Sequence, residues 1–330
     1  MANASKPYFL SSLGLPLYEL TTCKQVDDVQ QDVANAEIDS VSSVAKSDKE
    51  AERTYHGFNQ GKYFLPNDDE EQDRLDLQHR LFSITFDGQL ILAPVENPQR
   101  VLDIGTGTGI WVVEYALQNP ASVITGIDLS PVSRKSIPPN CHFLVADAEA
   151  EWAYPSPFNY IHGRALFTCF RNPLSVFQSA FASLVPGSYF EMQEIYFRPH
   201  SNDNSINGTA LEAWNAKVVE GAKILGKDWW CPPKYKTWFE EAGFVDVEEK
   251  VFSWPGKEWA KGEKQKELGR TMFKNIMRGL SAISMMVLTK AFGMSAEEVE
   301  AMLVDVKKDM GNLDIHDYYP IYVVFGRKPL

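Results

Sequence analysis

One eleven-residue run constrains the fold of this chain more than any other, VLDIGTGTGIW at residues 101–111. Its first four residues read as a buried strand, and a helix is expected from about Ile110. Between them Gly105, Gly107 and Gly109 alternate with threonines, and a backbone without Cβ atoms can pass close to a ligand. Free N–H groups and a positive dipole end at the helix start attract anionic or polar groups. The run therefore predicts a strand, loop and helix that bind a nucleotide-like molecule.

The spacing of the glycines narrows the class of ligand. Dinucleotide-binding enzymes carry G-x-G-x-x-G, in which the third glycine packs the helix on the strand. This chain has G-x-G-x-G, and Ile110 occupies the position of that third glycine. An acidic residue, Asp103, precedes the loop, and Thr106 lies within it. The pattern is typical of S-adenosylmethionine (SAM) methyltransferases and disfavours nicotinamide enzymes.

Carboxylates also follow the next two predicted strands. Asp128 ends the apolar run 123–127, and Asp147 with Ala148 ends the run 142–146. A carboxylate roughly 20 residues beyond the glycine loop is placed to accept both ribose hydroxyls. Asp147 is placed to accept from the adenine amino group, while a backbone N–H meets the ring. The alternative is three solvated loop carboxylates around a tight turn, which does not explain why each follows a strand.

Length and charge restrict the remaining function classes. The 330 residues suffice for one large α/β domain or two small ones, and 44% apolar content supports a sizeable core. A net charge of −12 and a pI near 5.1 argue against a nucleic-acid partner, whose phosphates require a basic face. The four scattered cysteines show no ligand spacing, so no metal site is expected. Without a visible secretory signal or membrane-spanning segment, a cytoplasmic protein of unknown oligomeric state is expected.

The order of predicted elements indicates an α/β, Rossmann-like fold. From Arg100 onward strands alternate with helices, which predicts a parallel sheet. Strands are expected at 101–104, 123–127, 142–146, 158–162, 187–194, 243–254 and 318–327. Helices are expected at 69–86, 111–119, 173–184 and 234–242.

The predicted domain organisation is a short N-terminal segment followed by one domain. Residues 1–50 are mixed in composition and are expected to be partly mobile. Residues 51–330 are expected to form a single domain with helical insertions at about 198–233 and 256–315. The insertions are too long to be plain connections, and insertions at the carboxyl edge of such a sheet usually cover the substrate site. We therefore expect them to form a cap over the pocket.

Several further motifs, spread over residues 51–255, carry a family resemblance. They are YHxxxxGKYxxPND at 55–68, EQxRLDLQH at 71–79, DLSP at 128–131, DAExEW at 147–152, YIHxR at 160–164, and PG at 186–187 followed by ExQE at 191–194. Together with residues 101–111, they resemble the fungal LaeA-like (TAM-domain, UMTA-type) class I SAM methyltransferases. The resemblance implies a seven-stranded sheet, SAM as methyl donor with S-adenosylhomocysteine as product, and a role in secondary metabolism.

Residues of these motifs extend the expected cofactor site. Leu129 follows the ribose-binding carboxylate, and Arg164 is a candidate for the SAM carboxylate or an acidic substrate, with a structural salt bridge as the alternative. Gly163 stands where the family commonly has a larger residue, which would widen the pocket. Tyr55, Lys62 and Tyr63 resemble a lid over SAM, although a simple packing loop explains the same residues.

Two side chains are candidates for a general base, which is needed only if the acceptor must lose a proton. His162 should project near the sulfonium at the end of its strand; a structural histidine or a SAM contact is the alternative. Glu194 lies at the tip of the fifth strand. Strand alternation places Glu191 and Gln193 on its other face.

Three functions remain open from the sequence. The chain is a small-molecule methyltransferase, a LaeA-like regulator that acts through protein partners and could be nuclear, or a methyltransferase fold that catalyses a SAM-assisted cyclisation or isomerisation. Aromatic residues in and around the cap favour a bulky, apolar or aromatic small molecule as the acceptor. They are Trp214, Trp229, Trp230, Tyr235, Trp238, Trp254 and Trp259.

Overall fold

The computed structural model describes residues 48–50, 53–55, 62, 65–134 and 136–330. All of these residues belong to one compact unit, residues 45–330. Tyr63 lies outside the described residues, and only the backbone of Tyr55 is described. Of the three predicted lid residues, Lys62 alone is therefore described with its side chain.

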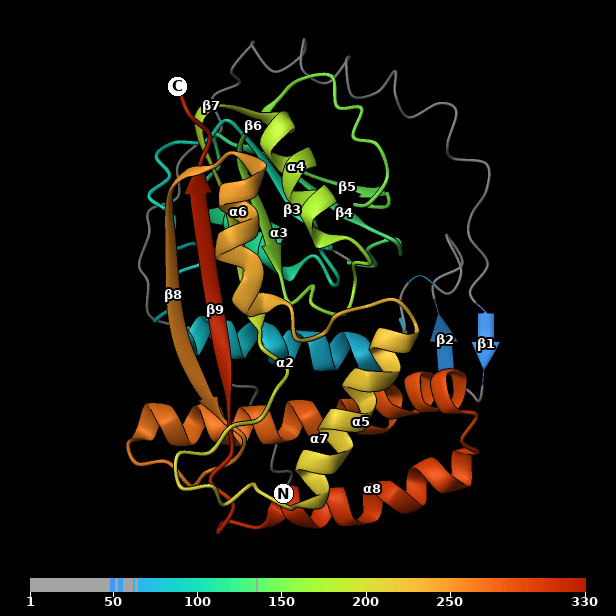
Figure 1. Cartoon of the computed structure of the whole chain (residues 1–330). Coiled ribbons are helices and arrows are strands. Elements are labelled where there is room, and N and C mark those ends of the chain that lie inside the picture. Colours follow the sequence, from blue (N-terminus) through green and yellow to red (C-terminus); the bar gives the residue numbers. More distant parts are fainter. Residues whose placement is uncertain (1–47, 51–52, 56–61, 63–64, 135) are drawn as a thin grey trace, which may run out of the picture. The chain divides into compact units, whose positions relative to one another are not determined.

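A seven-stranded sheet with the order β5-β4-β3-β6-β7-β9-β8 forms the centre of this unit (Figure 1). Its strands are β3 (Arg100–Ile104), β4 (Val123–Asp128), β5 (Cys141–Val145), β6 (Phe158–Arg164), β7 (Leu184–Ile195), β8 (Val245–Pro255) and β9 (Tyr318–Arg327). A separate antiparallel pair consists of β1 (Asp48–Glu50) and β2 (Arg53–Tyr55).

The sheet is mixed rather than parallel. Strands β3 to β7 pair in parallel, whereas β9 runs antiparallel to both β7 and β8. The Rossmann-like sheet of seven strands is thus confirmed, and the prediction of parallel pairing throughout is wrong at β9. The antiparallel direction of β9 follows from the long helical connection after β8, because this connection ends at the carboxyl edge of the sheet. There Tyr318 pairs with Pro255, the last residue of β8, so β9 must run back from that edge.

Helices cover both faces of the sheet. They are α2 (Asp69–Thr85), α3 (Ile110–Gln118), α4 (Pro173–Ser183), α5 (Ala210–Ile224), α6 (Tyr235–Ala242), α7 (Glu263–Phe292) and α8 (Ala296–Gly311), with a short 3₁₀ turn η1 (Pro232–Lys234) before α6. The second predicted helical insertion, at about 256–315, contains two helices. Gly293 ends α7 with a φ of +66°, and Ser295 and Glu298 form a capping box at the start of α8.

Side chains alternate across the sheet into two apolar layers. Val101 and Tyr160 belong to one buried cluster, and their neighbours Leu102 and Ile161 belong to the other. The first cluster extends into α2, α3, α5, α7 and α8, and the second into α4 and α6. Because successive strand residues point to opposite faces, both faces of the sheet are buried.

The two segments predicted as helical insertions contain α5, α7 and α8. Helix α7 follows the carboxyl end of β8 and packs against α2, α5 and α8. Figure 1 shows α5, α7 and α8 grouped beyond the end of β8. The indole N–H of Trp214 in α5 donates to Ser284 Oγ in α7 at 2.8 Å, which ties the two helices together. None of the described helices is long and apolar enough to span a membrane.

Candidate functional site

Three adjoining cavities lie at the carboxyl edge of the sheet. The outer cavity is bordered by residues that include Lys62, Gly105, Gly107, Asp128, Leu129, Asp147 and Ala148. The inner cavity is bordered by residues that include His79, Asp103, Thr106, Trp111, His162 and Arg164. The apolar cavity is bordered by residues that include Arg74, Gln78, Phe167, Trp229, Met272, Asn275, Ile276 and Ile283. Leu75 and Ala165 border all three, so the cavities form neighbouring parts of one site.

The glycine loop between β3 and α3 has a backbone that requires glycine. Gly105 and Gly107 have φ of +61° and +55°, a region that other residues rarely adopt. A Cβ at Gly105 would overlap the side chain of Leu166. At Gly107 a Cβ would meet only Leu75, at 3.5 Å, and Gly107 borders both the outer and the inner cavity. The open space at Gly107 is therefore available to a ligand.

Gly109 has a different role from the one predicted. It starts α3 with a φ of +74°, and a Cβ there would lie 2.8 Å from the ring of Phe143. Gly109 does not border any of the three cavities. Its missing side chain allows the start of α3 to pack against β5, so the expected cofactor contact at Gly109 is corrected to a packing role.

Asp128 is held beside the glycine loop. One carboxylate oxygen accepts from the N–H of Gly107 at 2.8 Å, and the other accepts from the N–H of Ser130 at 3.0 Å. Both Asp128 and Leu129 border the outer cavity. These hydrogen bonds fix the carboxylate at the tip of β4, where the sequence predicts the ribose site.

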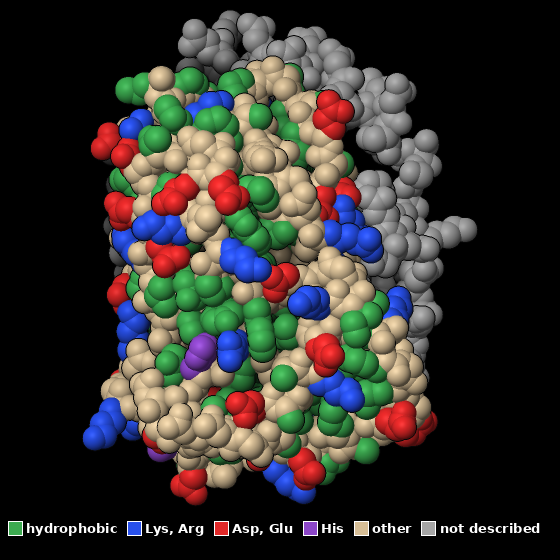
Figure 2. Space-filling model, in the orientation of Figure 1, with side chains coloured by type: hydrophobic (Ala, Val, Ile, Leu, Met, Phe, Trp, Pro, Cys, Tyr) green, Lys and Arg blue, Asp and Glu red, His purple; other side chains and the backbone are tan. Residues whose placement is uncertain are grey.

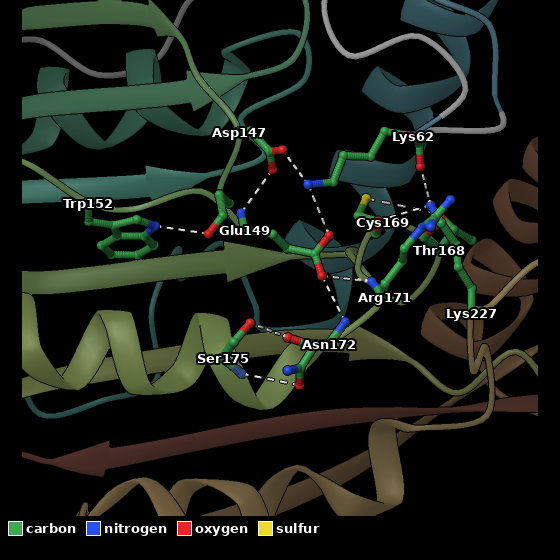
Figure 3. A network of polar contacts seen from close by, with 11 residues as sticks. Lys62, Asp147, Glu149, Trp152, Thr168, Cys169, Arg171, Asn172, Ser175 and Lys227 are labelled. Atoms are coloured by element: carbon green, nitrogen blue, oxygen red, sulfur yellow. Dashed lines mark hydrogen bonds and ion pairs between the residues drawn. The ribbon is translucent and has the colours of Figure 1, made fainter.

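Asp147, at the end of β5, pairs with the ammonium of Lys62 (Figure 3). The same ammonium lies 3.1 Å from Glu149 Oε2, and the backbone oxygen of Lys62 accepts from Lys227. Lys227 also donates to the carbonyl oxygens of Thr168 and Cys169, at 2.8 and 2.9 Å. Burial lowers the pKa of Lys227 to about 8. The Lys62 side chain thus contacts the β5 edge of the outer cavity, and Lys227 holds its backbone. No sequence motif indicated this role of Lys227.

The imidazole of His162 is enclosed by the protein. Its Nδ1 lies 2.7 Å from Asp103 Oδ1, and its ring stacks on Trp111 with centroids 3.9 Å apart. Its Nε2 is buried without a hydrogen-bond partner among the described residues. If Nδ1 carries the proton and donates to Asp103, Nε2 is left with a free lone pair beside the inner cavity. This geometry supports both a structural role and a contact with a bound ligand.

Arg164 borders both the inner and the outer cavity. Its Nη2 donates to His79 Nδ1 at 2.7 Å, which places the proton of that neutral ring on Nε2, facing Glu114 at 3.0 Å. The guanidinium also lies over the ring of Phe82. Burial lowers its pKa to about 10, so it stays charged at neutral pH.

Two predicted site residues lie away from the cavities. Glu194 is fully buried, where it accepts from the N–H groups of Leu166 and Ile195 and from the Tyr235 hydroxyl. It borders none of the three cavities, so its expected catalytic role is corrected to support of the loop after β6. Gly163 also borders none of them, and a Cβ there would lie 2.7 Å from Met192 Sδ. Gly163 therefore makes room for Met192 and does not widen the pocket.

The apolar cavity contains residues that the sequence did not single out. Helix α7 supplies Met272, Ile276 and Ile283, while α2 contributes Arg74 and Gln78. Of the aromatic residues in and around the cap, Trp229 is the one that borders this cavity; Trp214 and Trp254 are fully buried in the core. The helical periodicity of α7 indicates its apolar face. It does not indicate that four residues of α7, the three named above and Asn275, border a cavity.

Comparison with known proteins assigns the fold to a family. A family model described as a methyltransferase domain matches residues 76–249. The chain is 35% identical to "Probable methyltransferase tdiE" of Emericella nidulans, over 90% of this chain and 93% of that protein. The chain belongs to the LaeA-like SAM-dependent methyltransferases. It is also 31% identical to methyltransferase pytC of Aspergillus terreus, over 92% and 96% of the two chains. Against "Protein-methionine methyltransferase laeA" of Emericella nidulans the identity is 32%, over 84% and 75%.

The cavities of this LaeA-like methyltransferase fit its cofactor, SAM. The outer cavity spans about 1530 Å³, open solvent at its mouth included. Two buried polar atoms beside the inner cavity, Thr106 Oγ1 and His162 Nε2, have no partner among the described residues. Asp128 and Asp147 border the outer cavity with carboxylates, and Arg164 borders both cavities with a cation. These donors and acceptors are of the kinds that the nucleoside and amino-acid ends of SAM require.

Proposed function

We propose that this methyltransferase acts on a small, largely apolar molecule of secondary metabolism, as a pathway enzyme. The observation that carries the proposal is the apolar cavity, which adjoins the glycine-loop side of the site and spans about 570 Å³, open solvent included. Mainly apolar walls with a few polar groups are typical of small-molecule sites. Phe167, Trp229 and Met272 supply such walls.

The surface supports a small acceptor rather than a nucleic acid. Acidic and basic side chains are interspersed among apolar ones on the face seen in Figure 2. The net charge of −12 adds a general repulsion of phosphate backbones. Methyl transfer to the acceptor should therefore depend only weakly on salt.

The chemistry requires orientation more than proton transfer. When bound, SAM supplies an electrophilic methyl group. The electron pair of the sulfur–carbon bond that breaks stays on the sulfur. The walls of the apolar cavity hold the acceptor next to the glycine-loop side and exclude water, which raises the effective concentration of the reacting atoms. If the acceptor must lose a proton, His162 Nε2 is the candidate base, because it is buried beside the inner cavity without a partner among the described residues.

A regulatory role is the second candidate, and the likeness to laeA favours it. The relatives thus include two proteins named only as methyltransferases and one named as a protein-methionine methyltransferase, at similar identity. A protein substrate would have to present one side chain to the apolar cavity. The enclosed, mainly apolar wall under α7 favours the small molecule instead.

Gene deletion and in vitro methylation test the proposal together. Deletion should accumulate one compound that is lighter than the normal product by one CH₂, and purified protein with SAM should convert that compound to the product. Broad loss of many metabolites, accompanied by reduced transcripts and no such compound, would support the regulatory function in its place.

Substitution of His162 separates the roles of a base and a cofactor contact. If His162 is the base, His162→Gln should lower turnover about 10²–10⁴-fold while S-adenosylhomocysteine affinity stays unchanged. If affinity falls and turnover at saturating SAM does not, His162 is a cofactor contact. Calorimetry and single-turnover kinetics on the same preparation distinguish the two results.

A further inference from the structure

A buried polar cluster interrupts the apolar cavity. Arg74, Gln78 and Asn275 border the cavity, and Glu71 lies behind Arg74. All four residues are at most 6% exposed. Arg74 and Gln78 belong to α2, whereas Asn275 belongs to α7, so the cluster also joins these two helices.

The guanidinium of Arg74 determines how both amides are oriented. Its Nη1 donates to Gln78 Oε1 at 2.9 Å and to Asn275 Oδ1 at 3.0 Å. Arginine has donors only, so each amide must turn its oxygen toward Arg74 and its NH₂ group away. The orientation of these two NH₂ groups follows from the chemistry of the guanidinium.

Both NH₂ groups remain available for a ligand. Neither makes a hydrogen bond with another described residue, and neither nitrogen is among the fully buried atoms that lack a partner. Neither nitrogen is therefore fully enclosed, and of the three cavities Asn275 borders the apolar cavity. Gln78 borders both the apolar and the inner cavity.

The charge of the cluster indicates what these donors bind. Glu71 accepts from Arg74 through both oxygens, at 2.6 and 2.8 Å, which balances the guanidinium charge. A balanced ion pair gives little net attraction for a carboxylate or phosphate. An amide donor in an apolar wall costs free energy if it is left without a partner when the cavity is filled. The matching ligand group is a neutral oxygen.

We propose that Asn275, supported by Gln78, determines acceptor specificity by donating a hydrogen bond to a neutral oxygen, such as a carbonyl, on an otherwise apolar substrate. The inference rests on the proposed function, because it requires that the apolar cavity holds the acceptor. It adds that a molecule with such an oxygen is selected over one of the same shape without it. Arg74 acts as a positioning residue, since it donates to both amide oxygens and so orients both NH₂ groups.

Two probes of matched shape test the inference by calorimetry on the full chain saturated with S-adenosylhomocysteine. The probes are 2-acetylnaphthalene, which has a carbonyl, and 2-ethylnaphthalene, which has none. We expect the wild type to bind the ketone about five- to tenfold more tightly, the range for one net hydrogen bond. The preference should fall below about twofold in Asn275→Asp and in Asn275→Leu.

The aspartate variant separates recognition from structure. Asn275→Asp keeps an oxygen for Arg74, removes the donor and adds a negative charge beside the guanidinium, whereas Asn275→Leu removes both the oxygen and the donor. If Asn275 merely held Arg74 in place, Asp would preserve the ketone preference and only Leu would lose it, which would overturn the inference. Asn312→Asp, at the exposed end of α8, is the matched control and should bind both probes as the wild type does. Thermal unfolding of each variant verifies that it is folded.

The remaining outcomes distinguish the inference from the proposed function. Equal binding of both probes to the wild type would retain an apolar small-molecule cavity but overturn the role of the amide donors. Absence of binding of either probe to the wild type would overturn the proposed function, and the inference with it. A ketone preference that persists in both Asn275→Asp and Gln78→Glu would place the donor elsewhere and also overturn the inference.

Discussion

The cofactor side of the site and the acceptor side are built in different ways. The outer and inner cavities are formed by strand ends and the glycine loop, where backbone conformation places Gly107 and Asp128. The apolar cavity is formed by side chains from α2, α7 and the segment after β6, such as Arg74 and Asn275, which are 201 residues apart in the chain. One side thus depends on local backbone geometry and the other on long-range packing.

This difference implies that the two sides can be impaired separately. A substitution that alters the glycine loop should abolish cofactor binding without closing the apolar cavity. A substitution in α7 should do the reverse. Leu75 and Ala165, which border all three cavities, are the exception, and changes there should affect both sides.

The largest expected effect comes from Gly107→Val. The φ of +55° is strained for a β-branched residue, and the side chain would occupy space that borders both cofactor cavities. S-adenosylhomocysteine binding measured by calorimetry should be lost, while 2-ethylnaphthalene should still bind. Gly88→Val is the matched control, because Gly88 has a φ of +83° and open space around it. If Gly88→Val loses cofactor affinity equally, the strain has a global effect and the loop-specific explanation fails.

Asp128→Ala should weaken cofactor binding less completely. The loss of hydrogen bonds to a charged group corresponds to about 1.5–3 kcal/mol, or about 10–150-fold in affinity. Gly107 and Ser130 would also lose their N–H acceptor. Isothermal titration with S-adenosylhomocysteine measures the effect, and Asp305→Ala on the exposed face of α8 should leave the affinity as it is in the wild type. An unchanged affinity in Asp128→Ala would remove Asp128 from the ribose site.

Ile283→Phe should affect only the acceptor side. The larger ring would fill part of the apolar cavity, and we expect about a tenfold loss of 2-ethylnaphthalene affinity, or ~1.4 kcal/mol. Cofactor affinity should stay within about twofold of the wild type. Ile224→Phe, at an exposed position in α5, is the matched control. Equal loss of cofactor affinity in Ile283→Phe would show that the two sides are coupled.

Glu194→Gln should leave both sides intact and alter only the pH dependence of stability. Burial raises the pKa of Glu194 to about 8, so the folded state holds a proton that the unfolded state releases above about pH 4.5. The contribution of Glu194 to the free energy of unfolding is therefore fully present below pH 4.5 and is lost as the pH rises to about 8. Urea unfolding of both proteins between pH 4.5 and 8 should show that the advantage of wild type over variant falls across this range. A constant difference would place the pKa of Glu194 near its usual value.

Most residues that the sequence assigns to the cofactor border the outer or the inner cavity. Glycines at 105 and 107 and carboxylates at 103, 128 and 147 all lie at the ends of predicted strands, and parallel strands bring such ends to one edge. Gly109, Gly163 and Glu194 were predicted at the site and lie outside it. Each lies within two residues of a residue that borders a cavity, and sequence spacing alone does not show which neighbour faces the cavity.

The sequence by itself determined which functional features follow one another along the chain. These are a glycine loop, then successive acidic strand ends, then the helices of the cap. These are local features, because φ preference, strand alternation and helix capping act over a few residues. Only the tertiary structure decided that β9 runs back from the carboxyl edge, that His162 is enclosed by Asp103 and Trp111, and that Asn275 meets Arg74. Such contacts join segments that are far apart along the chain, and their sequence separation does not predict which of them meet in space. The contacts form when packing buries both faces of the sheet.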